Sequence, residues 1–284
     1  MSGADRPVAI VTGASRGIGK ATAIELARAG FDVVATGRTV HDGTARLGPE
    51  SDVVVPGGLD TTVEAVVAAG ATGLAVPMDL LDPSGVEAVV PTVLDRFGRL
   101  DALVNNAVYQ GPGTLAPISE LSATELTTMF EGNVVAALSL VQAALRPMIA
   151  QGRGSVVNLI SGAGLLTPPA RVGEGGWSVG YAMTKAALGR LAPVLHVEYR
   201  DQGIRAFSVD PGLVMTERME AAGRGDLYRR HFAAATPDVI GRAISWLLTD
   251  DAADELAGTV VMAQLEVRRR NLGGGPAPAA PPER

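Results

Sequence analysis

A tyrosine and a lysine four residues apart, Tyr181 and Lys185, are the residues of this sequence best suited to acid–base chemistry. They lie in a run with helical character, and positions i and i+4 share one face of a helix. An ammonium held beside a phenol favours the phenolate, so we expect the pKa of Tyr181 to fall from about 10 towards working pH. The pair is a candidate general acid/base for a carbonyl or hydroxyl group.

Composition strengthens this interpretation of the pair. The chain has 284 residues, and only two of its 24 lysine and arginine residues, Lys20 and Lys185, are lysines. Guanidinium and ammonium groups are not interchangeable, so an ammonium at position 185 of an arginine-rich chain indicates a specific role. The alternative is a surface tyrosine beside a solvated lysine.

A glycine-rich turn near the start of the chain is typical of a nucleotide site. An apolar run at residues 8–12 predicts a buried strand, residues 20–29 predict a helix, and a second strand follows. Between the first strand and the helix, Gly13, Gly17 and Gly19 allow a tight turn and the close approach of a pyrophosphate. Backbone N–H groups and the helix dipole favour an anion there, so this βαβ unit predicts dinucleotide binding.

Two arginines bear on which dinucleotide binds. Arg16 lies in the glycine loop, and Arg38 follows the second strand, where an acidic residue would bind the ribose diol of NAD. Two guanidinium groups can flank a 2′-phosphate, and one can stack on the adenine. We therefore favour NADP over NAD; the alternative is a pair of solvated arginines.

The spacing Gly-x-x-x-Gly-x-Gly after Thr12, with a later Tyr-x-x-x-Lys, resembles the signature of the short-chain dehydrogenase/reductase family, in its short single-domain branch. The resemblance covers about residues 6–265. It implies an α/β fold: one doubly wound Rossmann-type domain, with a mostly parallel seven-stranded sheet and helices on both faces. It also implies hydride transfer between NADP(H) and a ketone or secondary alcohol, in a homodimer or homotetramer. We expect the domain to cover residues 1–272.

The resemblance also implies roles for individual residues. Ser161 hydrogen-bonds the substrate oxygen, Tyr181 transfers its proton, and Lys185 tunes Tyr181 and binds the nicotinamide ribose. Asn133 holds a water behind the lysine for a proton relay. The expected cofactor-binding residues are Gly13, Ser15, Arg16, Gly17, Ile18, Gly19, Arg38, Asp79, Leu80, Asn106, Ala107, Tyr181, Lys185, Pro211, Val214 and Thr216.

Several features depart from the family's pattern. Residues 37–60 are rich in Gly, Pro and Asp and long for one loop, so we expect an insertion near the adenosine end of the site. Val108 stands where glycine is usual. Ser161 and Tyr181 are 20 positions apart (181 − 161), which is more than the family usually has. Pro193 should kink the helix that carries Tyr181.

Smaller signals complete the expected outline. Thr61, Ser84 and Ser122 are each followed three residues later by glutamate, a capping-box pattern that predicts a helix start at each. We also expect a short strand at residues 53–55, and a mobile lid over the substrate at residues 217–236.

Composition excludes several other classes of function. A net charge of −6 argues against a nucleic-acid or anionic-membrane partner, and the absence of cysteine excludes disulfides and cysteine-based zinc sites. The three histidines are scattered without metal-ligand spacing. We find no signal peptide and no apolar run of membrane-spanning length, so we expect a cytoplasmic protein. The Gly/Pro/Ala-rich residues 273–284 are expected to be disordered.

Two other functions stay open. The first is a catalytically silent NADP(H)-binding redox sensor on the same fold, although the complete set of Asn133, Ser161, Tyr181 and Lys185 favours an enzyme. The second is an epimerase or dehydratase of the family's longer branch, whose glycine spacing and larger C-terminal domain are missing here. The expected substrate is a small carbonyl or alcohol; an apolar ketone, a quinone, a steroid and a β-ketoacyl thioester all fit the sequence.

Overall fold

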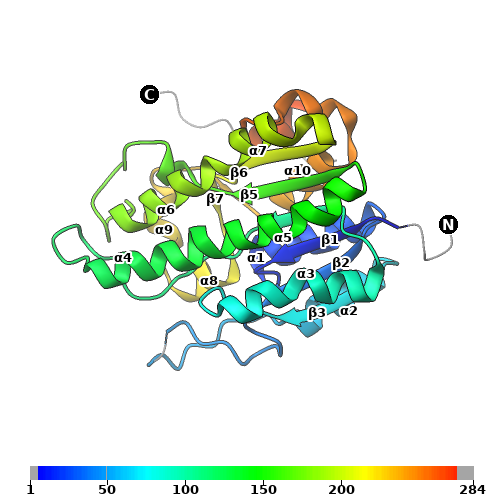
Figure 1. Cartoon of the computed structure of the whole chain (residues 1–284). Helices are drawn as coiled ribbons and strands as arrows, with labels where there is room; N and C mark the ends of the chain where they lie inside the picture. Colours follow the sequence, from blue (N-terminus) through cyan, green and yellow to red (C-terminus); the bar gives the residue numbers. More distant parts are fainter. Residues whose placement is uncertain (1–5, 49, 274–284) are drawn as a thin grey trace.

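A seven-stranded sheet forms the centre of the protein (Figure 1). The computed structural model describes residues 6–48 and 50–273, so the expected tail lies outside the described residues except for Gly273. The strand order is β3-β2-β1-β4-β5-β6-β9, and every pairing is parallel. This confirms the doubly wound fold. The strands are β1 (Val8–Thr12), β2 (Asp32–Gly37), β3 (Gly73–Pro77), β4 (Ala102–Asn105), β5 (Gly154–Leu159), β6 (Ile204–Asp210) and β9 (Val260–Met262).

Helices cover both faces of this sheet. Successive strand residues point to opposite faces, so Ala9 and Val11 of β1 join one apolar core while Val8 and Ile10 join the other. The first core is covered by α1 (Gly17–Arg28), α2 (Leu59–Ala68), α10 (Pro237–Thr249) and α11 (Ala263–Arg269). The second is covered by α3 (Pro83–Phe97), α5 (Ala136–Ala150) and α7 (Leu191–Tyr199), of which α3 and α5 lie in front of the sheet in Figure 1.

Four further α-helices and a pair of short strands gather beyond the carboxyl ends of the sheet strands (Figure 1). They are α4 (Ala123–Phe130), α6 (Val179–Gly189), α8 (Glu217–Ala221), α9 (Gly225–Arg229) and a small parallel pair, β7 (Leu213–Val214) with β8 (Ala234–Ala235). The strand expected at residues 53–55 is wrong: the segment makes only an isolated antiparallel bridge between Arg46 and Val54.

Of the three expected helix starts, only the one at Ser122 is confirmed. The Ser122 hydroxyl accepts from the Glu125 amide at 3.2 Å, and the Glu125 carboxylate accepts from the Ser122 amide at 2.9 Å. The other two helices begin earlier. Helix α2 follows Gly58, and α3 follows Asp82, whose carboxylate accepts from the Ser84 amide at 3.1 Å. These residues take the capping position before the expected Thr61 and Ser84.

Pro193 separates α6 from α7, as expected. Proline has no N–H to bond the carbonyl four residues back, which belongs to Gly189, the last residue of α6. The Ser208 hydroxyl of β6 donates to that carbonyl at 3.0 Å. The freed carbonyl therefore finds its partner in a neighbouring strand, and α7 begins separately at Leu191.

Residues 123–150 form one helical rod that is long and apolar enough to span a bilayer by length and composition alone. The expectation that no such run exists is therefore wrong by that measure. Leu140, Val141, Ala144 and Met148 of this rod are buried in the core under the sheet. We interpret the rod as a core helix of the α/β domain.

Candidate active site

The glycine loop follows β1 and packs against the residues that follow β4. Gly13 and Gly17 have φ of +66° and +57°, a conformation that favours glycine. A Cβ on Gly13 would lie 2.9 Å from the Cα of Ala107. The Thr12 hydroxyl accepts from the amides of Asn106 and Ala107, both at 2.9 Å. The predicted Gly13, Asn106 and Ala107 therefore lie together at the carboxyl edge of the sheet.

The start of α1 faces the segment that follows β6. A Cβ on Gly17 would lie 3.1 Å from the Thr216 methyl group, so a side chain here would crowd Thr216 as well as strain the backbone. The Gly17 amide donates to the Glu217 carboxylate at 2.9 Å. An anion-binding amide at a helix N-terminus, in a cradle that a Cβ would fill, fits the pyrophosphate of a dinucleotide. The backbone amides of Gly17 and Ile18 would hold that group.

Lys185 is buried in α6 beneath the end of β5. Its side chain is 4% exposed, and Nζ donates to the Leu159 carbonyl at 2.6 Å. Burial lowers the pKa of this ammonium to about 8, and the buried carboxylate of Asp210 partly opposes that shift. Nζ also lies 5.9 Å from the centroid of the Tyr181 ring. Tyr181 and Lys185 therefore share one face of α6, as their spacing predicts.

Tyr181 lies near Ser161, which lies just beyond β5, and Ser161 acts on its pKa. Burial raises the pKa of Tyr181, the hydrogen bond with Ser161 lowers it in part, and the charges of Asp210 and Tyr228 raise it further. The expectation that the pKa of Tyr181 is lowered is therefore wrong. The physical reason is that burial disfavours the phenolate, while the Lys185 ammonium is directed at the Leu159 carbonyl.

Asn133 lies in a π-helical turn, residues 131–135, between α4 and α5. It is 3% exposed, its side-chain oxygen accepts from the Tyr109 amide at 2.7 Å, and its side-chain nitrogen donates to Thr184 Oγ1 at 3.3 Å. Thr184 precedes Lys185 on α6. Such π-turns are frequent at functional sites, and this one brings Asn133 against the helix of Tyr181 and Lys185.

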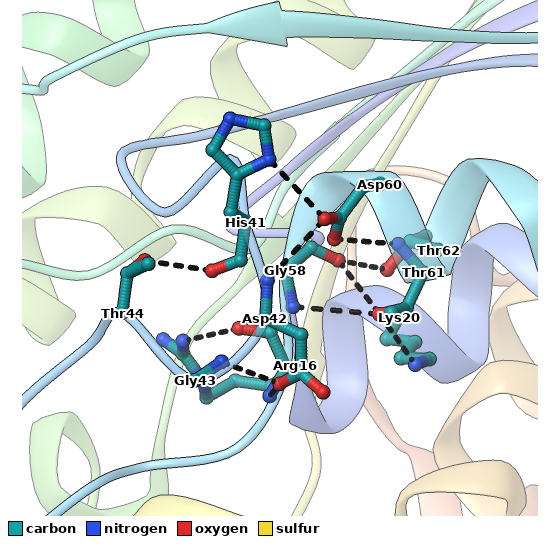
Figure 2. A network of polar contacts seen from close by, with 11 residues as sticks. Arg16, Lys20, His41, Asp42, Gly43, Thr44, Gly58, Asp60, Thr61 and Thr62 are labelled. Atoms are coloured by element: carbon teal, nitrogen blue, oxygen red, sulfur yellow. Dashed lines mark hydrogen bonds and ion pairs between the residues drawn. The ribbon is translucent and has the colours of Figure 1, made fainter.

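The adenosine end of the glycine loop is covered by residues 37–60 (Figure 2). Arg16 donates from Nε to the Pro56 carbonyl and from Nη2 to the Gly57 carbonyl, both at 2.8 Å. Arg38 is 65% exposed and lies 4.0 Å from the Asp79 carboxylate. The predicted Arg16, Arg38 and Asp79 thus border one region. Ser15 is buried in the loop beside them, and Leu80 packs on the core.

The long loop between Ser161 and Tyr181 meets the 217–236 segment, the expected lid, through aromatic rings. Trp177 precedes α6, and its ring centroid lies 6.2 Å from that of Phe232 in the 217–236 segment. Leu165 and Leu166, which follow Ser161, are 51% and 58% exposed. The substrate side of the site therefore carries apolar side chains from both segments.

Comparison with known proteins identifies the family. A family model described as short chain dehydrogenase matches residues 7–226. This chain belongs to the short-chain dehydrogenase/reductase family. A fluoren-9-ol dehydrogenase of Terrabacter sp. is 34% identical over 76% of this chain and 58% of its own length. An uncharacterized NAD-dependent oxidoreductase of Mycobacterium tuberculosis is 32% identical, over 86% of this chain and 89% of its own. The crystal structure of acetoin dehydrogenase from Enterobacter cloacae superposes with a TM-score of 0.70, at 29% identity, covering 90% of this chain and 94% of that one.

Proteins of this family are oxidoreductases that use a nicotinamide dinucleotide and act on alcohol or carbonyl groups. No group of three or more metal-ligating side chains occurs among residues 6–48 and 50–273. Pro211 and Val214 lie in the stretch between β6 and α8, at the edge where Gly17 meets Thr216. The structure therefore brings Pro211, Val214 and Thr216 to the same edge of the sheet as the glycine loop.

Sequence reasoning missed three charged residues of this site. Asp210 is buried at the end of β6, next to the Pro211 motif, and its charge acts on both Tyr181 and Lys185. Glu217 and Arg218 directly follow Thr216. Their position beside family motifs was the available signal.

Proposed function

We propose that this protein is an NADP(H)-dependent oxidoreductase that interconverts a ketone and a secondary alcohol, with Tyr181 as the acid/base. The observation that carries the proposal is the placement of the Tyr181 ring 5.9 Å from the buried Lys185 Nζ, with Ser161 just beyond β5 acting on Tyr181, at the same sheet edge as the glycine loop. A pure cofactor sensor needs no acid/base at that point.

The residues have separate roles in reduction of a ketone. NADPH, when bound, supplies the hydride that the carbonyl carbon accepts. Ser161 donates a hydrogen bond to the carbonyl oxygen, where negative charge develops. Tyr181 delivers its phenolic proton to that oxygen and is left as the phenolate, which the nearby Lys185 ammonium stabilises. Alcohol oxidation reverses these steps, with the phenolate taking the hydroxyl proton.

Asn133 would support this proton transfer from behind. It contacts α6 through Thr184, next to Lys185. We propose that Asn133 orders a water through which the proton lost by Tyr181 is replaced. The bonds of Asn133 to Tyr109 and Thr184 hold the buried amide in place beside the helix of Tyr181 and Lys185, which supports this role.

The preference for NADP rests on this chain's own arginines. The M. tuberculosis relative is named NAD-dependent, so kinship leaves either cofactor open. Arg16 and Arg38 border the adenosine end, and guanidinium groups bind a 2′-phosphate through charge-assisted hydrogen bonds. Asp79 and Leu80 would lie along the adenine.

We propose further that the protein is a cytoplasmic homodimer or homotetramer assembled through α5, α6 and α7. These helices carry large apolar side chains that are exposed in the single chain: Leu138 at 38%, Met183 at 44% and Val197 at 70%. Burial of such a face against a second copy would remove it from water.

The test of the proposed function is NADPH consumption with a panel of ketones. The reverse assay uses the matching secondary alcohols and NADP⁺. Turnover in either direction supports the enzyme, and tight NADPH binding without turnover across the panel would favour the redox sensor.

A further inference from the structure

A third arginine reaches the adenosine end from the opposite half of the chain. Arg218 lies in α8, directly after Glu217, and its Nη2 donates to the Leu47 carbonyl at 2.9 Å. Leu47 belongs to the 37–60 segment that also covers Arg16. The side chain of Arg218 therefore reaches the 37–60 segment, although Arg218 follows Thr216 closely in the chain.

The 37–60 segment holds Arg16 and Arg218 from two sides. Pro56 and Gly57 accept from Arg16, and Leu47 accepts from Arg218. The segment is itself held in place, because the Asp42 carboxylate accepts from the Gly57 amide at 2.5 Å. Both guanidinium groups are thus oriented by backbone carbonyls of one loop, which bear no full charge.

Arg16, Arg38 and Arg218 lie close enough to act on one another. Burial lowers the pKa of Arg16, and the charges of Arg218 and Arg38 lower it further. Burial also lowers the pKa of Arg218, with Arg38 adding to the effect. Glu217 and Asp42 offset part of this repulsion at Arg16, and Asp79 lies beside Arg38. Three gathered guanidinium groups favour a polyvalent anion between them.

We propose that Arg218 is a further specificity-determining residue, which binds the 2′-phosphate of NADP(H) together with Arg16 and Arg38. This inference rests on the proposed NADP dependence. It also gives the 217–236 segment, the expected lid over the substrate, a part in distinguishing NADPH from NADH. NADH has a hydroxyl at that position, and its binding should not depend on Arg218.

Binding measurements test this without relying on activity. Dissociation constants of NADPH, NADH, adenosine 2′,5′-bisphosphate and 5′-AMP would be measured by titration calorimetry for the wild type and Arg218→Gln. Glutamine removes the charge and the guanidinium donors while leaving a polar side chain at this position. Arg224→Gln, which changes an exposed arginine of the same segment, is the matched control.

We expect Arg218→Gln to weaken NADPH and the bisphosphate by about tenfold or more, in line with loss of a charge-assisted bond, and to change NADH and 5′-AMP by less than about twofold. Arg224→Gln should change none of them beyond about twofold. Equal weakening of NADPH and NADH would overturn the role of Arg218 and reduce it to holding the loop. If the wild type prefers NADPH and Arg218→Gln keeps that ratio, only this inference fails. A wild-type preference for NADH would overturn the NADP proposal and this inference with it.

Discussion

The Glu217 carboxylate accepts a hydrogen bond from the Gly17 amide at 2.9 Å, although the two residues are 200 positions apart. Gly17 begins α1, so the carboxylate lies at the positive end of that helix dipole. The same amide is suited to the cofactor pyrophosphate. Glu217 therefore competes with that group for one donor and repels its charge.

We expect Glu217→Gln to tighten binding of both NADPH and NADH, by roughly three- to tenfold, because like charges near a shared donor are unfavourable. The measurement is cofactor titration by fluorescence. Glu220→Gln, at an exposed position one turn on, is the control and should leave both constants unchanged. Weaker binding in Glu217→Gln would mean that the carboxylate helps to build the site instead.

The raised pKa of Tyr181 sets opposite pH dependences for the two reaction directions. Ketone reduction needs the phenol, which stays protonated across neutral pH, so its kcat/KM should be flat there. Alcohol oxidation needs the phenolate, so its kcat/KM should rise with pH. Asp210 raises this pKa, and Asp210→Asn should therefore move the rising limb of oxidation to lower pH. A limb that moves to higher pH, or stays in place, would contradict this electrostatic role.

Burial of Lys185 should make stability depend on pH. Its folded pKa of about 8 lies below the unfolded value of 10.5, so between these values the unfolded state binds more protons. The cost of burying the charge is fully present below pH 8 and is relieved as pH rises towards 10.5. It amounts to about 3 kcal/mol at most.

Lys185→Met removes this titration while filling the same space. Between pH 7 and 9.5 the wild type should gain unfolding free energy relative to the variant, as measured by urea denaturation at each pH. Parallel curves for the two proteins would show that Lys185 titrates normally in the folded state.

The proposed assembly face can be tested at its most exposed valine. Val197 of α7 is 70% exposed, and a glutamate there would place a charge in an apolar interface. We expect Val197→Glu to shift the protein to a smaller species in sedimentation velocity. Ile118→Glu, at an exposed loop position outside α5–α7, should leave the assembly intact. Monomeric wild-type protein would refute the interface.

Much of the fold was predictable, because β-branched runs bounded by turn residues mark buried parallel strands. Residues 8–12 became a strand with the expected bounds. Helix starts were less predictable where several capping residues compete. Asp82 precedes Ser84 in the chain and takes the N-cap, and glycine at position 58 leaves Thr61 inside its helix. The Ser122 box forms with both of its reciprocal hydrogen bonds to Glu125, so the helix begins where the pattern predicts.

The chemistry of the site was predictable in its residues and less so in its electrostatics. Spacing places Tyr181 and Lys185 on one helix face, as observed. The direction of the Tyr181 pKa depends on burial and on Asp210, which tertiary packing brings near. The hydrogen bond from Gly17 to Glu217 likewise joins distant segments, and no local sequence pattern predicts it.

The most direct test of the proposed activity is NADPH oxidation with a ketone panel, followed at the nicotinamide absorbance for the wild type and Tyr181→Phe. We expect consumption that strongly favours NADPH over NADH. The variant should lose at least about a hundredfold in kcat, the lower range for a general acid, while its Kd for NADPH stays within about twofold. Turnover that persists in Tyr181→Phe would contradict the role of Tyr181, and tight NADPH binding with no turnover in either direction would contradict the enzyme itself.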